Sequence, residues 1–169
     1  MPSVQPYDIG CEPSPSGPAE TVIADGWCTY LLFFAVSKTL NPGGKLDDLR
    51  VAVLHCDHCV VSQFGYPNDE GFREHPLYNL GLDDSGSSVL EIVDSPWSRK
   101  VGEQSEASAR RIWGDRYDES WLSRSDLRHF IVALKEATFE CIAKSMTVEL
   151  FAETFEIAMD HVNKKMSEH

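Results

Sequence analysis

Residues 128–143 read RHFIVALKEATFECIA, and this stretch decides the fold. Apolar and β-branched residues fill 130–134 and 138–143 on either side of a short break, which predicts a β-hairpin. With Glu136 and Ala137 as the turn, Leu134 faces Phe139. One face then forms the core side of the hairpin, and it holds Phe130, Val132, Leu134, Phe139, Cys141 and Ala143. Glu-Ala is not a preferred turn pair, so a one-residue slip stays open.

Other apolar and β-branched runs predict four more strands, at residues 27–36, 50–54, 59–64 and 89–93. The NPGG sequence at 41–44 is a turn signal that ends the first of them. Residues 55–58 are polar apart from one cysteine and lie between the second and third runs, which indicates a second hairpin. Together these runs predict an antiparallel sheet of about five to six strands.

Two helices are expected as well. Ser95 and Pro96 are typical of an N-cap followed by a first helical residue, and they predict a short helix to about residue 103. Residues 104–126 are interpreted as a helical turn plus loop. At the C-terminus, apolar residues recur on one stripe, which predicts an amphipathic helix. The stripe consists of Phe151, Phe155, Ala158, Met159, Val162 and Met166.

The order of these elements, strands first and a helix last, predicts an α+β fold. The antiparallel sheet is expected to be packed by the C-terminal amphipathic helix and by the short helix after residue 95. Five of the nine prolines lie within residues 1–20, so this part is interpreted as an irregular N-terminal arm. Residues 21–169 are expected to form a single α+β domain.

The chain is acidic, with 27 Asp and Glu against 15 Lys and Arg and a formal net charge of −12. Such a charge repels a phosphate backbone and an anionic membrane, so neither nucleic acid nor membrane is an expected partner. No apolar run approaches the ~20 residues of a membrane span, and no secretory signal is recognised. Five cysteines do not indicate a disulfide framework, which favours a cytoplasmic protein with reduced thiols. A small molecule, a protein or a second copy of the chain is left as partner.

Residues 65–82 (GYPNDEGFREHPLYNLGL) form a long irregular segment, and long loops in compact domains are often functional. A carboxylate beside an imidazole can perform acid/base chemistry or hold a metal, because each group tunes the pKa of the other. The alternative is that these residues only turn the chain and anchor the loop by packing. The candidate ligand-binding residues here are Tyr66, Asn68, Asp69, Glu70, His75 and Tyr78.

Two other groups of residues are candidates for a chemical role. Cys56 and Cys59 form a C-x-x-C between two histidines, which suits zinc, but no second ligand pair is visible and a polar turn is the alternative. Glu140 is expected in apolar surroundings that would raise its pKa, although such a residue more often faces solvent or pairs with an arginine such as Arg128. In the expected register, Glu140 is too distant from His129 for direct contact.

Four runs resemble a family of small uncharacterised proteins: FGYPNDEG (64–71), HPLYNLGL (75–82), VLEIVDSPW (89–97) and RHFIVALKEATFECIA (128–143). That family shows FGYPNDEA…HPLY, a short E-V-x-x-S-x-W stretch and RHF-x-x-x-FHDSTFEC. The resemblance implies no established activity, substrate or cofactor. Where the family has His-Asp-Ser, this chain has Lys135, Glu136 and Ala137, so a mechanism relying on those three residues would be absent. A shared site is then expected among Asp69, Glu70, His75, Tyr78 and Trp97.

The leading hypothesis is a non-catalytic module that binds a small molecule or a protein through the 65–82 loop. It rests on the aromatic and polar composition of that loop and on the lack of a complete catalytic motif. The alternative is a small acid/base or metal-dependent enzyme that uses His75 with Asp69 or Glu70. Both the cofactor and the ligand are left open.

Overall fold

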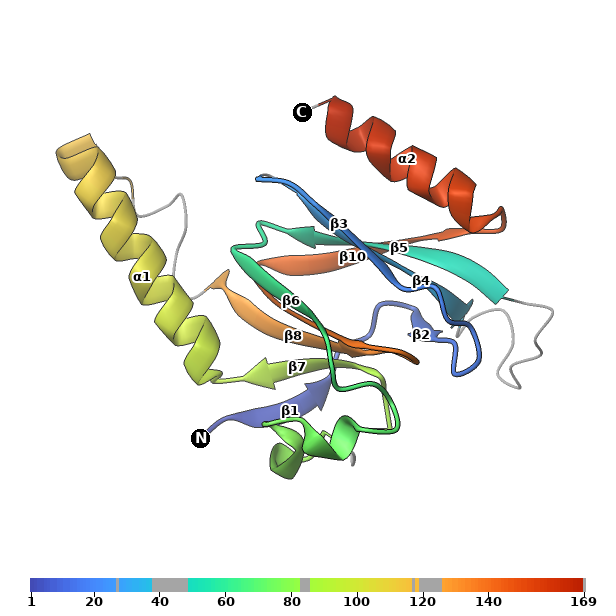
Figure 1. The fold of residues 1–169 in the computed structure, drawn as a ribbon. Coiled ribbons are helices and arrows are strands. Elements are labelled where there is room, and N and C mark those ends of the chain that lie inside the picture. Colours follow the sequence, from blue (N-terminus) through green and yellow to red (C-terminus); the bar gives the residue numbers. More distant parts are fainter. Residues whose placement is uncertain (27, 38–48, 83–85, 117, 119–125, 169) are drawn as a thin grey trace.

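The computed structural model describes residues 1–26, 28–37, 49–82, 86–116, 118 and 126–168 (Figure 1). The α+β class is confirmed, but the strands divide between two antiparallel sheets. In order across the first sheet lie β1 (Ser3–Pro6), β7 (Val89–Val93), β8 (Arg128–Ala133), β9 (Thr138–Ala143) and β6 (Val61–Gly65). The second holds β10 (Ser145–Phe151), β5 (Leu49–Asp57), β4 (Thr29–Ser37) and β2 (Cys11–Pro13), with β3 (Thr21–Ala24) also paired to β4.

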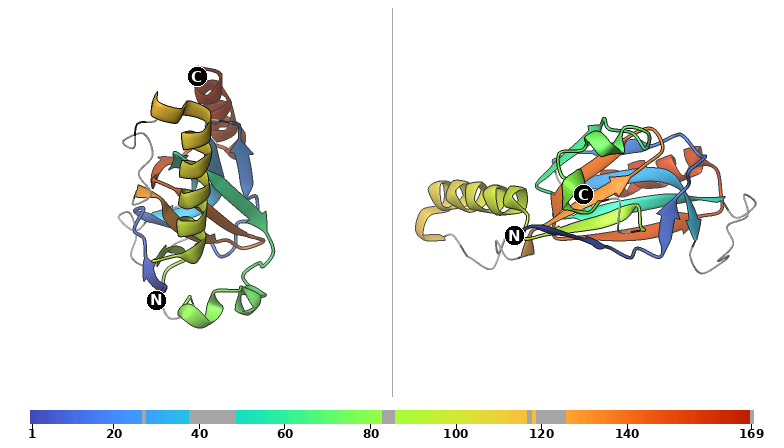
Figure 2. Two further views of the ribbon diagram at one scale, coloured as in Figure 1. Left: turned by 90° about the vertical axis from the view of Figure 1, so that its left-hand side faces the viewer. Right: turned by 90° about the horizontal axis from the view of Figure 1, so that it is seen from below.

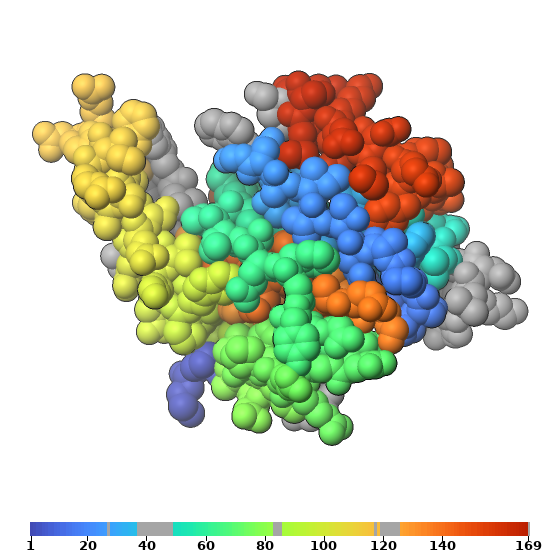
Figure 3. All heavy atoms as spheres, in the orientation of Figure 1, coloured from blue at the N-terminus to red at the C-terminus, as the bar shows by residue number. Residues whose placement is uncertain are grey.

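The two sheets pack face to face, and a covering element lies on the outer face of each (Figures 1 and 2). Phe33, Leu54 and Phe139 belong to the apolar core between the sheets. Helix α2 (Phe155–Ser167) covers the second sheet, as the predicted apolar stripe requires. The 65–82 segment covers the first sheet, with short 3-10 turns at Phe72–Glu74 and Tyr78–Leu80. Its atoms form the lower front of the molecule in Figure 3.

The predicted β8–β9 hairpin is confirmed, but its turn is one residue earlier than expected. Leu134 N–H donates to the carbonyl of Ala137 (2.9 Å), so Lys135 and Glu136 occupy the turn. Glu140 consequently lies opposite Ile131 rather than Ala133. The predicted core face is unchanged, because moving the turn by one residue shifts the pairing by two and preserves the alternation.

The second predicted hairpin is wrong, because β5 and β6 belong to different sheets. Strand β5 pairs with β4 and β10, whereas β6 pairs with β9. His58 has a positive φ of 48° in the connection, where the chain passes from one sheet to the other. A short polar break between two apolar runs does not reveal this change of sheet. Strand β10 is also absent from the sequence prediction.

The irregular N-terminal arm is a second wrong prediction. Strand β1 pairs with β7, and β2 pairs with β4. Proline marked this region as irregular, yet Pro6 and Pro13 each end a strand, and both strands lie at sheet edges where a missing N–H is tolerated. Trp27, the 41–44 turn and Trp121 lie outside the described residues.

Helix α1 (Pro96–Trp113) begins at the predicted cap and is much longer than predicted. Ser95 Oγ accepts the backbone N–H groups of Trp97 and Ser98, which caps the first turn. Gly114, with a φ of 54°, follows the last helical residue. The helix is attached at its N-terminal part and projects past the side of the sheets (Figure 2). Within the described residues, neither helix combines the length and apolarity needed to cross a membrane.

Candidate ligand-binding site

Three buried polar side chains meet on the outer face of the first sheet. His75 comes from the 65–82 segment, His129 from β8 and Glu140 from β9. Nε2 of His75 lies 3.0 Å from Glu140 Oε1, and Nε2 of His129 lies 2.9 Å from Glu140 Oε2. All three side chains are almost fully enclosed. The carboxylate therefore joins the covering segment to the hairpin beneath it.

The proton on His75 can be assigned from its partners. Nδ1 accepts the backbone N–H of Leu77 at 3.2 Å, so this nitrogen carries no proton. Nε2 must then carry the proton and donate it to Glu140. Both nitrogens of the imidazole are therefore occupied.

The proton on His129 can be assigned from its partners in the same way. Its Nδ1 lies 2.9 Å from Ser95 Oγ. Because Ser95 Oγ already accepts two backbone N–H groups, its own hydroxyl proton is available for Nδ1. Nε2 of His129 therefore donates to Glu140. A hydrogen-bonded chain thus runs from the start of α1 through the hairpin to the 65–82 segment.

Glu140 is ionised in this environment. Burial alone opposes ionisation, but hydrogen bonds from His129, His75 and Gln63 outweigh it and lower the pKa of Glu140 to about 2. Gln63 Nε2 donates to Oε1 across the β6–β9 pair at 2.5 Å. Three donors thus serve a carboxylate that has about four lone-pair sites, which leaves capacity for one more donor.

A pocket of about 290 Å³ opens beside this carboxylate. Nine residues line it, from β6, β9 and the covering segment: Gln63, Phe64, Gly65, Tyr66, Pro67, His75, Pro76, Thr138 and Glu140. Phe64 and Tyr66 are unusually exposed for aromatic residues, at 44% and 71%. None of the nine is a lysine or an arginine. The pocket therefore combines an anionic inner wall with an aromatic rim.

The structure brings some of the predicted site residues together and separates others. Tyr66 and His75 line the pocket. Asn68 Oδ1 accepts the N–H of Gly71 (3.0 Å), which is a local turn role. Asp69 forms an exposed ion pair with Lys135 (2.8 Å). Glu70 is exposed and is absent from the pocket lining.

The remaining two predicted residues are packing groups. Tyr78 contacts Phe72 edge-on, with ring centroids 6.5 Å apart, in the apolar cluster beneath the segment. Trp97 also lies edge-on, against His129, at 5.0 Å. Trp97 supports the buried histidine from α1 and is absent from the lining of the pocket.

Three expectations about the chemistry need correction. His75 pairs with Glu140, and both of its nitrogens are occupied without Asp69 or Glu70. His129 and Glu140 are in direct contact, because the earlier turn brings Glu140 two residues closer to His129 along the ladder. The pKa of Glu140 is lowered rather than raised, because its neighbours are hydrogen-bond donors. Only the period-2 alternation of β8 and β9, which places His129 and Glu140 on one face, could have indicated their contact.

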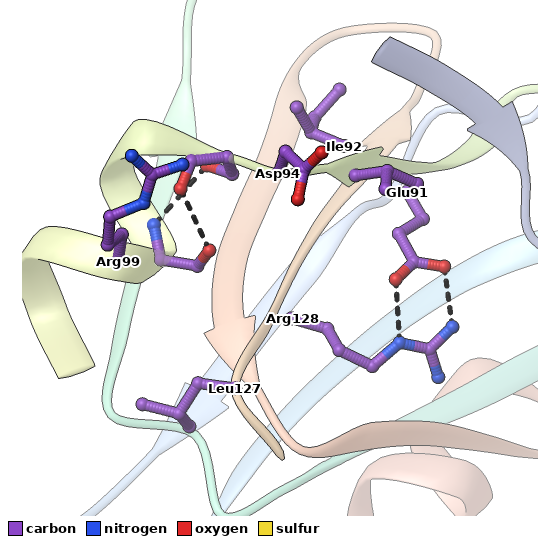
Figure 4. Close-up of a pocket in the computed structure, with 9 residues that line it drawn as sticks. Glu91, Ile92, Asp94, Arg99, Leu127 and Arg128 are labelled. Atoms are coloured by element: carbon purple, nitrogen blue, oxygen red, sulfur yellow. Dashed lines mark hydrogen bonds and ion pairs between the residues drawn. The ribbon is translucent and has the colours of Figure 1, made fainter. Parts of the chain in front are cut away.

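A second pocket, of about 340 Å³, lies where β7 meets α1 (Figure 4). Arg128 forms a bidentate pair with Glu91 on its wall, at 2.7 and 2.5 Å. The guanidinium also lies 4.9 Å from the ring centroid of Tyr7 and 5.0 Å from that of Phe130. Arg128 is therefore held in place by Tyr7, which follows β1, by Glu91 of β7 and by Phe130 of β8. This is a structural role and not the pairing with Glu140 that the sequence allowed.

The two cysteines of the C-x-x-C motif, Cys56 and Cys59, lie in different surroundings. Cys56 is buried, and its sulfur lies 3.8 Å from that of Cys141 between the sheets. Cys59 is half-buried, and hydrogen bonding to Cys141 is the main cause that lowers its pKa to about 7. His58 bonds Asp57 at the surface. Within the described residues, no group of three or more Cys, His, Asp and Glu side chains has a geometry that could hold a metal ion.

Comparison with known proteins adds no assignment. No family model matches the chain, and neither the curated proteins nor the solved structures include a match. The resemblance through the four sequence runs therefore stays a prediction, and the function is argued from the pocket itself.

Proposed function

We propose that this protein is a binding module whose pocket accepts an ammonium or guanidinium group. The observation that carries this proposal is Glu140, an ionised carboxylate in the wall of a pocket whose lining contains no lysine or arginine. A cationic ligand would supply the positive charge that the pocket lining lacks, and it would also supply further hydrogen-bond donors for Glu140. Charge-assisted hydrogen bonds of this kind are about twice as strong as neutral ones.

The aromatic rim supports the same ligand chemistry. A cation over the face of an aromatic ring gains about 0.5–1 kcal/mol at an exposed site. Tyr66 provides such a ring at the mouth. The Tyr66 hydroxyl donates to Glu74, which adds a second carboxylate near the entrance. The overall acidity of the chain favours the approach of cationic ligands as well.

The hydrogen bonds of the two buried histidines favour binding over the catalytic alternative. A general base needs a nitrogen or oxygen that can take a proton from a substrate. Both nitrogens of His75 are engaged, and so are both nitrogens of His129. The pKa of Glu140 is far below neutrality, which makes it a weak base and a permanent anion.

The test is a calorimetric titration with two isosteric probes. Nα-acetyl-arginine methylamide carries a guanidinium, and Nα-acetyl-citrulline methylamide carries a neutral urea of the same shape. We expect the arginine probe to bind at least tenfold more tightly. Equal affinity for the two probes, or no binding of either, would contradict the proposal.

A variant of the protein completes this test. Gln63 is exposed and already bonds Glu140, so Gln63→Lys should place an ammonium inside the pocket and compete with the probe. We expect it to abolish the preference for arginine. Gln104→Lys makes the same charge change on the exposed surface of α1 and should bind as the wild type does.

A further inference from the structure

The pocket opens along an unpaired strand edge. Strand β6 is the last strand of its sheet, with β9 on one side and no strand of the described residues on the other. Its sequence, VSQFG, contains neither a charged residue nor a proline. Proteins normally protect edge strands with such residues, because an unprotected edge pairs readily with another chain.

The other edge strands carry this protection. Strands β1 and β2 each end in a proline, and β10 carries Glu149, which bonds Lys165 of the covering helix. Strand β3 is bracketed by Glu20 and Asp25. On β6 and directly beside it, in contrast, Val60, Phe64 and Tyr66 are exposed apolar or aromatic residues. The unprotected edge is thus also the edge that borders the pocket.

We propose that the ligand is an extended peptide that pairs with β6 as an added strand and inserts an arginine or lysine into the pocket. This inference rests on the proposed function and names the molecule that presents the cation. Pairing of this kind takes its affinity from main-chain hydrogen bonds and its selectivity from alternate side chains.

The geometry of the sheet dictates the length of the inserted side chain. Neighbouring strands lie about 4.8 Å apart, so an added strand would be about 10 Å from β9, which carries Glu140. Only a long side chain reaches across β6 to that carboxylate. Arginine and lysine are the cationic residues of that length.

Alternation along β6 dictates the flanking residues. Gln63 points to the outer face, where it bonds Glu140. Phe64 points the opposite way, because its partner Phe139 belongs to the core between the sheets. In an added strand, the residues on each side of the cation would therefore lie on the same face as Phe64, one beside Phe64 and the other beside Ser62. The expected motif is apolar, then arginine or lysine, then apolar.

A second copy of this chain fits the edge less well. Two copies each carry a net charge of −12 and repel each other. If β6 of one copy paired with β6 of another, it would present no cation to either pocket. The charge of the site therefore favours a basic peptide.

The experiment compares acetyl-Thr-Val-Arg-Val-Thr-amide with Nα-acetyl-arginine methylamide by titration calorimetry. We expect the peptide to bind at least tenfold more tightly, since it adds main-chain pairing. Two backbone N-methylated forms, modified at alternate residues, provide the internal control. In the bound peptide, one set of N–H groups faces β6 and the other faces solvent. Only the form that is methylated on the set facing β6 should therefore lose the extra affinity.

Amide hydrogen exchange gives a second readout on the unmodified protein. The peptide should slow exchange in residues 61–65, whereas the arginine probe should not. Phe64→Ala should reduce the peptide's advantage, and Ile157→Ala, at a similarly exposed apolar position on α2, should leave it unchanged.

The outcomes separate the two proposals. If the arginine probe binds but the peptide binds no more tightly, the edge-pairing inference is overturned and the proposed function stands. Equal affinity of both N-methylated forms and the parent peptide also overturns it. If sedimentation shows a dimer that the peptide dissociates, a second copy is the natural occupant and the inference is wrong. If neither ligand binds, both proposals fail.

Discussion

His75 and Glu140 are 65 positions apart in the chain, and their side chains are 3.0 Å apart in the folded protein. One belongs to an irregular segment and the other to the central part of a sheet. Their bond holds the 65–82 segment on the sheet, and it also helps to keep Glu140 charged beside the pocket. Stability and ligand binding therefore depend on the same pair of atoms.

Glu140→Gln should destabilise the protein. The amide keeps one acceptor oxygen and puts an NH2 group in place of the other, so either His129 or His75 would meet a donor instead of an acceptor and leave buried polar groups unsatisfied. We expect a loss of roughly 2–3 kcal/mol in the free energy of unfolding. Urea denaturation measures it. Glu136→Gln, in the exposed turn of the same hairpin, is the matched control and should change stability by less than about 0.5 kcal/mol. Equal effects of the two substitutions would show that the buried network contributes little.

Acid should remove the stabilisation that Glu140 provides. Its pKa falls from an ordinary 4.5 to about 2 on folding, so the unfolded chain binds the proton more readily. The contribution is complete above about pH 4.5 and is lost as the pH falls towards 2. The stability difference between wild type and Glu140→Gln should accordingly shrink across that window. A difference that is constant from pH 5 to pH 2.5 would show that the carboxylate is not held ionised.

Ser95→Ala should weaken both α1 and the buried network. The substitution removes an N-cap, which costs about 1 kcal/mol, and it also removes the partner of His129 Nδ1. Chemical denaturation should show a larger loss than the cap alone explains, and the ring resonances of His129 should move in NMR spectra. Ser108→Ala, at an exposed position of the same helix, should have no such effect. Unchanged His129 resonances would exclude the predicted hydrogen bond.

Cys59 should be the most reactive thiol among the five. It is half-buried, whereas the other four cysteines are buried, and its pKa is about 7. Brief treatment with iodoacetamide at pH 7.5, followed by peptide mass spectrometry, should find the label mainly on Cys59. The alkylation rate should reach half its maximum near pH 7. Cys59→Ser should leave the native protein almost unlabelled, and rapid labelling of Cys141 would be inconsistent with its burial.

Local patterns predicted the elements whose partners are close in the sequence. The 128–143 hairpin and the apolar stripe of α2 depend on alternation and periodicity within short windows. The hairpin is confirmed, and so is the stripe from Phe155 onward, whereas Phe151 ends strand β10 and is not helical. The separation of β5 from β6 depends on pairing with β9 and β10, which are far along the chain. No local pattern contains that information.

The candidate site was predicted in part for the same reason. The unusual composition of the 65–82 segment drew attention to Tyr66 and His75, which do line the pocket. Gln63 and Glu140 were not connected with them, because their contacts depend on β6 lying beside β9. A carboxylate with three donors also cannot be distinguished from a solvent-facing one by sequence.

Helix α1 acts as a lever whose pivot is Ser95. Its 18 residues span about 27 Å at 1.5 Å per residue, so one degree of rotation at the base moves the far end by about 0.5 Å. The pivot shares a hydrogen-bonded chain with the carboxylate of Glu140. A rotation of α1 about Ser95 would therefore displace its far end, at Trp113, much further than it displaced the groups around Glu140.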